Sequence, residues 1–206
     1  MAAPGRALLA YDRTRGRLVA GADEAGKACL AGPLVAAAVC LDFDRIDPEA
    51  ELALARLNDS KKLSKTRCLQ LRGVVLELAA RTSIVVVSAA EIDRDGIHPS
   101  QLGALAKVLE AVCPADALLV DHFRLPALRL AHESITRGDS TSAAIACASI
   151  LAKTEHDRLM QEADSVYPGY GFATNFGYSS PEHKEAIRTL GPTPLHRRSY
   201  RLPTRG

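Results

Sequence analysis

The sequence predicts an α/β fold with a mixed central sheet flanked by helices. Two observations predict it. Short apolar stretches with alternating or β-branched character predict strands at residues 18–23, 34–41, 83–88, 117–121 and 128–134. Between and after them, apolar residues at three- and four-residue spacing predict helices at residues 48–57, 65–80, 100–112, 142–163 and 181–190. Because strands and helices alternate along most of the chain, we expect one central sheet.

The connection between the first two predicted strands indicates their direction. Only about ten residues without a helical pattern join them, which favours an antiparallel pair over a crossover helix. The later strands alternate with helices, so the sheet is expected to be mixed. Ser64 before Lys65, and Ser180 before Pro181, are typical of residues at which helices begin.

Composition indicates one soluble globular domain. The chain has 206 residues, of which 47% are hydrophobic and 24% charged, and this balance argues against disorder. Its apolar stretches are far shorter than the roughly 20 residues of a membrane-spanning helix. The first ten residues lack a secretory pattern, and the odd number of cysteines has no CxxC pair. We therefore expect a cytoplasmic protein without disulfides, zinc or a membrane partner, and a monomer by default.

Charge is distributed unevenly at the carboxy terminus. The formal net charge is only +2, which does not by itself indicate a nucleic-acid partner. Residues 196–206, however, contain no acidic residue and carry Arg197, Arg198, Arg201 and Arg205. Such a basic tail can neutralise phosphates, and it is equally typical of a solvated terminus. Both interpretations stay open.

Four carboxylates lie where predicted strands end. Asp23 and Glu24 stand before a glycine turn, Asp121 ends the fourth strand, and Asp139 follows the fifth. Adjacent like charges raise one another's pKa unless a cation balances them, which suggests a metal site. Each residue alone is also compatible with a turn or a helix cap, as for Asp139 before Ser140. Only the set of four favours one shared site.

Oxygen ligands without His or Cys select hard ions, so we expect Mg²⁺ or Mn²⁺. Two such ions can support hydrolysis of a phosphodiester. Asp23 and Glu24 would point to opposite faces of a regular strand, so the chain must bend at Ala25-Gly26 for both to contribute. Asp157 is a rival for Asp139, but about eighteen helical residues between them would span about 27 Å. We interpret Asp157 as a surface residue paired with Arg158 or Lys153.

Ordered sequence blocks resemble the type 2 ribonuclease H family in its bacterial form, ribonuclease HII. They run from about residue 18 to about residue 200, and they are residues 21–27, 31–39, 59–64, 119–121, 138–140, 146–153, 167–172 and 191–199. The resemblance implies a ribonuclease H-like catalytic domain at residues 17–166. Residues 1–16 would be an amino-terminal tail, and residues 167–206 a loop-helix extension with a basic tail.

The resemblance also implies an activity. Members cut the RNA strand of RNA/DNA hybrids and cut at ribonucleotides embedded in duplex DNA, leaving a 3′-hydroxyl and a 5′-phosphate. Asp23, Glu24, Asp121 and Asp139 match the metal-binding carboxylates of the family, in agreement with the reading from the residues alone. The nucleic acid would be the partner, with two divalent ions in the mechanism.

Recognition of the 2′-hydroxyl in the family uses a Gly-Arg-Gly backbone and a tyrosine on the ribose. The matching residues are Gly26, Lys27, Ala28 and Tyr178, so the chain departs at Lys27 and Ala28. Lysine lacks the planar fork of arginine, and alanine disfavours positive φ and adds a methyl group. His122, Phe176 and the pair Glu155-His156 are further departures, and two of these remove positive charge.

Other residues are candidate substrate contacts. Ser60 and Lys61 match the family's Asp-Ser-Lys element, while Ser149 and Lys153 lie four apart on one helical face. Tyr170 and Phe172 are interpreted as core or loop anchors and not as platforms for base stacking. Two other functions stay open: a hybrid-binding paralogue with weakened cleavage because of Lys27 and Ala28, and a nuclease of the same fold that acts on DNA structures.

Overall fold

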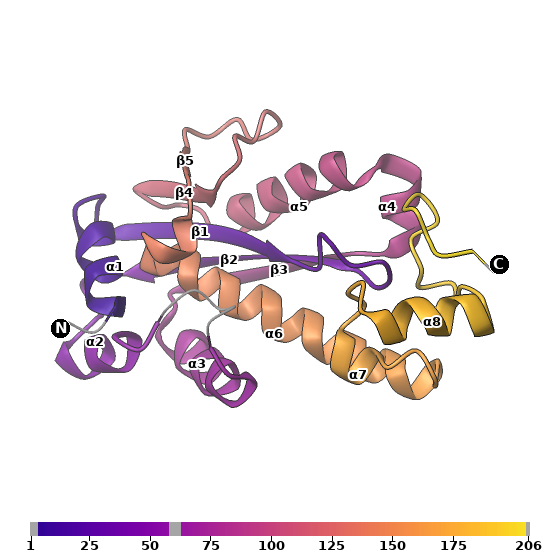
Figure 1. Cartoon of the computed structure of the whole chain (residues 1–206). Helices are drawn as coiled ribbons and strands as arrows, with labels where there is room; N and C mark the ends of the chain where they lie inside the picture. The colour runs from indigo at the N-terminus through magenta and orange to yellow at the C-terminus, as the bar shows by residue number, and fades with distance from the viewer. Residues whose placement is uncertain (1–3, 58–62, 205–206) are drawn as a thin grey trace.

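A mixed five-stranded sheet lies at the centre of the computed structural model, which describes residues 4–57 and 63–204 (Figure 1). Its strands follow the order β3-β2-β1-β4-β5. They are β1 (Leu18–Ala25), β2 (Leu34–Asp42), β3 (Arg81–Val87), β4 (Ala117–Asp121) and β5 (Glu133–Ile135). β1–β2 and β2–β3 pair antiparallel, whereas β4 runs parallel to both β1 and β5. The predicted mixed sheet and its antiparallel first pair are confirmed.

Helices cover both faces of the sheet. They are α1 (Pro4–Arg13), α2 (Pro48–Leu54), α3 (Lys65–Leu78), α4 (Ala89–Asp95), α5 (Ile97–Ala111), α6 (Ala143–Val166), α7 (Phe172–Asn175) and α8 (Pro181–Leu190), with a 3₁₀ turn η2 (Gly138–Ser140). The predicted helices are present with ends shifted by a few residues. The sequence did not predict α4 and α7, and α1 occupies the segment that was expected to be a tail. In the described part of the chain, no helix is long and apolar enough to cross a membrane.

Side chains of the central strands alternate between two cores. In β2, Val35, Val39 and Leu41 pack on the side of α6, α1 and α3, whereas Ala36 and Cys40 pack on the side of α5. Figure 1 shows α6 crossing one face of β1 and β2, with α5 beyond the other. Every residue of β2 is buried, because helices lie on both sides of it. The last predicted strand is shorter than expected, since residues 128–132 belong to a loop.

A glycine fixes how closely α6 approaches the sheet. A Cβ added to Gly21 of β1 would stand 2.3 Å from the backbone nitrogen of Ile145, far inside van der Waals contact. Any larger residue there would push the first turn of α6 away from β1. The Ala-rich start of α6 therefore packs closely on the sheet.

The carboxy-terminal elements form a third core on the far end of α6. Leu30, Met160, Tyr170, Phe172 and Ile187 are buried together there. The rings of Tyr170 and Phe172 stack with centroids 5.5 Å apart, which confirms that they are core anchors. α7 and α8 are thus held against both α6 and the loop between β1 and β2.

A pair of histidines lies within this carboxy-terminal region. The Nε2 atoms of His183 and His196 are 3.1 Å apart, and both side chains are buried. Burial lowers the pKa of His183, and burial with the neighbouring His183 lowers the pKa of His196 to about 4. Both rings are therefore neutral near pH 7, so one nitrogen can donate to the other.

The basic carboxy-terminal stretch is not a uniform tail. Arg197 is completely buried, as is His196, whereas Arg198 and Arg201 are exposed. Arg205 lies outside the described residues. The expectation of phosphate-binding or solvated side chains is therefore wrong for Arg197, whose guanidinium binds backbone carbonyls inside the protein.

Asp12 anchors α1 to the start of α6. Its Oδ2 atom accepts a hydrogen bond of 2.8 Å from the Ala144 backbone N–H, and its side chain is completely buried. Burial raises the pKa of this carboxyl to about 6, although hydrogen bonds from the first turn of α6 act in the opposite direction. The carboxylate satisfies a helix N–H that has no intrahelical partner.

Asp12→Ala should therefore destabilise the protein. The substitution leaves a buried N–H unpaired, at a cost of about 1–3 kcal/mol. Thermal unfolding at pH 7 should show a lower midpoint, by about 2–4 °C for each kcal/mol in a chain of this size. Asp95→Ala, which removes an exposed partner of Arg94, is the control and should move the midpoint little. Equal midpoints for Asp12→Ala and the native chain would contradict the anchoring role.

Candidate active site

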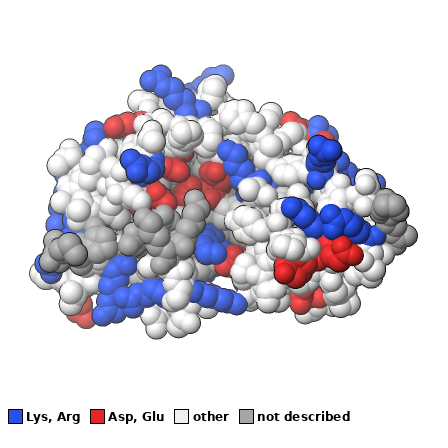
Figure 2. Space-filling model, in the orientation of Figure 1, with Lys and Arg blue, Asp and Glu red and all other residues white. Residues whose placement is uncertain are grey.

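The four candidate carboxylates lie at or just beyond the ends of β1 and β4 and on the 3₁₀ turn η2. These strands are parallel neighbours, so Asp23 and Glu24 at the end of β1 lie beside Asp121 at the end of β4. The Gly138 N–H donates a hydrogen bond of 2.6 Å to Asp121 Oδ1, which brings η2 and its Asp139 next to Asp121. Asp139 lies in this 3₁₀ turn, and Ser142 caps α6 instead. In Figure 2, acidic side chains gather near the middle of the visible face, with Lys and Arg around them.

Asp23 is the most deeply placed of these carboxylates. Its side chain is 8% exposed, and its Oδ1 accepts a hydrogen bond of 2.7 Å from the Glu24 N–H. The Ser149 side chain of α6 is a second hydrogen-bond partner. Burial first, and then the charges of Glu24 and Asp121, raise the pKa of Asp23 to about 8. Three carboxylates therefore lie close enough to repel one another.

Asp23 and Glu24 point to opposite faces of β1, as regular strand geometry requires. Asp23 lies on the α6 side with Ser149, whereas Glu24 Oε1 accepts a hydrogen bond of 2.7 Å from Gln101 Nε2 of α5. β1 stays regular as far as Ala25, and the chain turns at Gly26 with φ +84°. The expected bend is therefore present, and it follows the two carboxylates. Gln101 is completely buried, and nothing in the sequence around it marks its contact with Glu24.

A cavity of about 310 Å³ opens beside Asp23 and Glu24. Its lining brings together candidates from three distant segments: Asp23, Glu24, Ala25, Gly26, Lys27, Ala28, Ser149, Lys153, His156, Asp157 and Tyr178. Of the predicted substrate contacts, only Ser60 and Lys61 cannot be placed, since they lie outside the described residues. The sequence marks His156 only as a departure from the family pattern and not as a site residue, yet this histidine lines the cavity.

The buried Arg197 side chain stabilises the turn that follows β1 by binding its backbone carbonyls. Its guanidinium donates to the carbonyl oxygens of Gly26 at 2.7 Å, Lys27 at 2.8 Å, Gly32 at 3.1 Å and Pro33 at 3.0 Å. The Tyr200 hydroxyl donates a further bond of 2.9 Å to the Lys27 carbonyl. With these carbonyl oxygens bonded inward, the conformation of the turn is fixed by side chains from the carboxy-terminal segment.

The structure removes one of the two effects expected of alanine at position 28, the backbone strain of a positive φ. Ala28 is exposed and is not among the described residues with a positive φ, so its backbone carries no strain of that kind. The added methyl group remains as its only evident effect. The Lys27 Nζ atom lies 4.5 Å from the centroid of the Phe123 ring, a cation–π contact that directs the side chain toward the loop after β4.

Asp157 is not a surface residue, and that expectation was wrong. Its side chain is buried at the wall of the cavity, while the predicted pairing with Lys153 is present at 2.8 Å. Asp139 precedes the first turn of α6, whereas Asp157 lies in its second half, since α6 runs unbroken from residue 143 to residue 166. Asp157 therefore stays separate from the Asp121–Asp139 pair.

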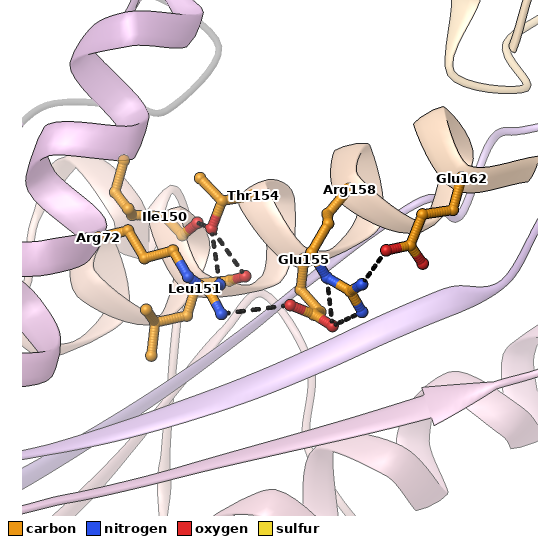
Figure 3. A network of polar contacts seen from close by, with 7 residues as sticks. All are labelled: Arg72, Ile150, Leu151, Thr154, Glu155, Arg158 and Glu162. Carbon is orange, nitrogen blue, oxygen red and sulfur yellow. Dashed lines mark hydrogen bonds and ion pairs between the residues drawn. The ribbon is translucent and has the colours of Figure 1, made fainter. Parts of the chain in front are cut away.

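Positive side chains beside α6 are themselves paired with acids. Arg72 of α3 donates to Thr154 at 3.0 Å and to Glu155 at 3.2 Å, and Arg158 binds Glu155 at 2.6 Å (Figure 3). Figure 3 also shows the contact from Arg158 to Glu162. Glu155 thus lies between two guanidinium groups, which hold its pKa below the usual range against the effect of burial.

The carboxylates have the chemistry of a hard-ion site. Within residues 4–57 and 63–204, no three His, Cys, Asp or Glu side chains already form a group that could hold a metal ion. Asp121 and Glu24 bind Gly138 and Gln101 instead. The donor set is nevertheless all oxygen, and burial, together with the charges of Glu24 and Asp121, raises the pKa of Asp23. This set fits Mg²⁺ or Mn²⁺, which bind through few carboxylates and keep water ligands.

Comparison with known proteins identifies one family. The model of the family described as "Ribonuclease HII" matches residues 20–202. A "Ribonuclease HII" of Chloroflexus aggregans is 44% identical over 185 residues, which cover 89% of this chain and 86% of the relative. One of Rhodococcus erythropolis is 43% identical over 183 residues, covering 88% and 79%.

Solved structures agree with the fold. The ribonuclease H2 of Pyrococcus horikoshii superposes with a TM-score of 0.75 at 23% identity, covering 89% of this chain and 93% of that one. The RNase HII of Archaeoglobus fulgidus, solved in a complex with PCNA, gives a TM-score of 0.71 at 27% identity, covering 90% and 96%. Sheet, helices and carboxy-terminal helical region therefore follow an established architecture.

Asp23→Asn should stabilise the metal-free protein at alkaline pH. The pKa of Asp23 is raised in the folded state, so its ionisation costs stability as pH rises from about 4 through about 8. Asparagine removes that cost. In EDTA, the thermal midpoint of the variant should exceed that of the native chain by several degrees at pH 9 and by much less at pH 5. Identical differences at both pH values would show that Asp23 is not electrostatically strained.

Proposed function

The chain belongs to the ribonuclease HII family, and we propose that it uses Asp23, Glu24, Asp121 and Asp139 to hold the divalent ions of its reaction. It is a type 2 ribonuclease H, an endonuclease that hydrolyses phosphodiesters in the RNA strand of RNA/DNA hybrids. Cleavage at single ribonucleotides in duplex DNA, with 3′-hydroxyl and 5′-phosphate products, is part of the proposal.

One observation carries this proposal: a single cavity joins Asp23 and Glu24 to the residues that would recognise a ribose. Asp23 and Glu24 form one end of it, and Gly26, Lys27, Ala28 and Tyr178 form another part of the lining. A ribose held against the turn and Tyr178 would place its 3′ phosphodiester beside the carboxylates. The geometry therefore supports a cut next to a 2′-hydroxyl, the group that separates RNA from DNA.

The divalent ion, Mg²⁺ or Mn²⁺, would activate a water and stabilise the leaving oxygen. The protein's own residues prepare for this. Ser149 and the Glu24 N–H fix the Asp23 carboxylate, and Gly138 fixes that of Asp121. We therefore assign the Ser149 hydroxyl to orienting Asp23. We also propose that Lys153, which forms an ion pair with Asp157 and lines the cavity, contacts a phosphate. We further propose that the enzyme works as a cytoplasmic monomer.

Asp121→Asn should abolish cleavage and leave the fold intact. The amide lowers the negative charge at the site and weakens its hold on a divalent ion, so the rate should fall below about one hundredth of the native value. The measurement is turnover of a long hybrid and of a single-ribonucleotide duplex in Mg²⁺ and in Mn²⁺. Asp44→Asn, at an exposed ion pair with Arg17, is the matched control. Cleavage at the native rate by Asp121→Asn would exclude the carboxylate assignment.

Lys27→Arg/Ala28→Gly should increase cleavage of a single-ribonucleotide duplex, by about two- to tenfold in kcat/KM. Glycine removes the exposed methyl group beside the sugar, and arginine offers a planar fork to phosphate. The two single variants separate these effects, and an all-DNA duplex is the substrate control. Equal rates and equal cut positions would remove the idea that this motif limits junction cleavage. A native chain that binds hybrids without cutting them would instead favour the binding paralogue.

A further inference from the structure

The two halves of the proposed ribose site come from distant parts of the chain and must be held at a fixed spacing. One half is the backbone of residues 26–28 after β1, and the other is Tyr178, which follows α7. Backbone hydrogen bonds link residues next to the two halves: the N–H groups of Leu30 and Ala31 donate to the Gly177 carbonyl at 2.8 and 3.4 Å. Side chains beneath the cavity supply the remaining support.

His156 of α6 contacts both halves at once. Its ring is 2% exposed and lies so close to the turn that a Cβ added to Gly26 would stand 2.5 Å from its Cδ2 atom. The same ring meets Tyr178 edge to face, with centroids 6.4 Å apart and an interplanar angle of 62°. A single buried imidazole thus fills the space below the turn and the space beside the tyrosine.

Cys29 completes this support from the turn itself. Its Sγ atom lies 3.8 Å from His156 Nε2 and 3.4 Å from the Phe176 carbonyl oxygen, two residues before Tyr178. Cys29 and Tyr178 are also hydrogen-bond partners through their side chains. Burial raises the pKa of the Cys29 thiol to about 12, so the group stays protonated and can donate near neutral pH.

The orientation of the imidazole is set by polar contacts. On the side opposite Cys29, His156 Nδ1 lies 3.6 Å from Asp157 Oδ1, and Asp157 in turn binds Lys153. An apolar ring of similar size would fill the same volume without these contacts. Burying an imidazole costs free energy unless its nitrogens find partners, so packing alone does not account for histidine here.

We propose that His156 and Cys29 are positioning residues, which set the spacing between the residue 26–28 backbone and the Tyr178 ring and so govern the discrimination of ribose from deoxyribose. This inference rests on the proposed function for the identity of the ribose site. The proposal gives neither residue a contact with the scissile phosphate. Both act through Tyr178, and that dependence is what an experiment can measure.

The test is a double-mutant cycle on a DNA duplex that carries one ribonucleotide. His156→Phe keeps a ring and removes both nitrogens, Cys29→Ala removes the thiol, and each is made in the native chain and in Tyr178→Ala. Cys147→Ala removes a fully buried thiol at a different place, in α6, and is the matched control. Melting curves are recorded for every variant, so that kinetic constants are compared only well below each midpoint.

In the native background, His156→Phe should lower kcat about tenfold and change KM less than about twofold, since small misplacements of a bound substrate are costly. Cys29→Ala should act in the same direction, and Cys147→Ala should change kcat less than about twofold. In Tyr178→Ala, the His156 and Cys29 substitutions should each change kcat less than about twofold. An equal tenfold fall in both backgrounds would overturn the proposal. If His156→Phe does not fold, the Cys29→Ala cycle decides by the same criterion.

A binding measurement separates this inference from the proposed function. In EDTA, fluorescence anisotropy gives the affinity for the single-ribonucleotide duplex and for the same duplex in all-DNA form. His156→Phe and Cys29→Ala should bring the ratio of these affinities toward one, and Cys147→Ala should leave it unchanged. An unchanged ratio in the first two variants would overturn the positioning role. Absence of turnover by the native chain would count against the proposed function, while the ratio would still decide the inference.

Discussion

The buried guanidinium of Arg197 is the interaction on which the candidate site depends most. It replaces water as the partner of four carbonyl groups in the turn and loop after β1, from Gly26 to Pro33. A buried charge of this kind is stable only where its donors are satisfied, so the turn and the carboxy-terminal segment can fold only in register with each other. The catalytic region and the carboxy-terminal extension therefore form one structural unit at this point.

The alternation of β1 determines the chemistry that surrounds each carboxylate. Asp23 shares its face with Asp121 and with α6, where burial and like charge accumulate. Glu24, one residue further, faces α5 and is held by Gln101. Because β1 ends at Ala25, both side chains still reach the same cavity. One strand end thus supplies two carboxylates in different environments, and burial with like charge raises the pKa of Asp23.

Local patterns predicted most of the fold, and long-range partners account for what they missed. The apolar alternation of β1 and β2 predicted these strands to within about two residues, and the ends of predicted strands are also what groups the four carboxylates into one candidate site. α1 was missed because its helix is stabilised by contacts such as the bond from Ala144 to Asp12, 132 positions away in the chain. Gln101, His156 and Arg197 are polar residues that become buried through partners from other elements. No local pattern distinguishes such residues from solvated ones.

The departures from the family pattern at Glu155 and Phe176 have a smaller electrostatic effect than the sequence alone predicts. Glu155 is neutralised by Arg72 and Arg158, so it adds little net negative charge to this side of α6. The Phe176 ring lies 5.9 Å from Lys65 Nζ and 5.6 Å from Lys153 Nζ. The aromatic face keeps two ammonium groups near the cavity by cation–π attraction, at a position where a lysine would have repelled them. Positive charge is therefore retained beside the cavity, and a change in specificity would originate in the altered residue 26–28 turn and its support by His156 and Cys29.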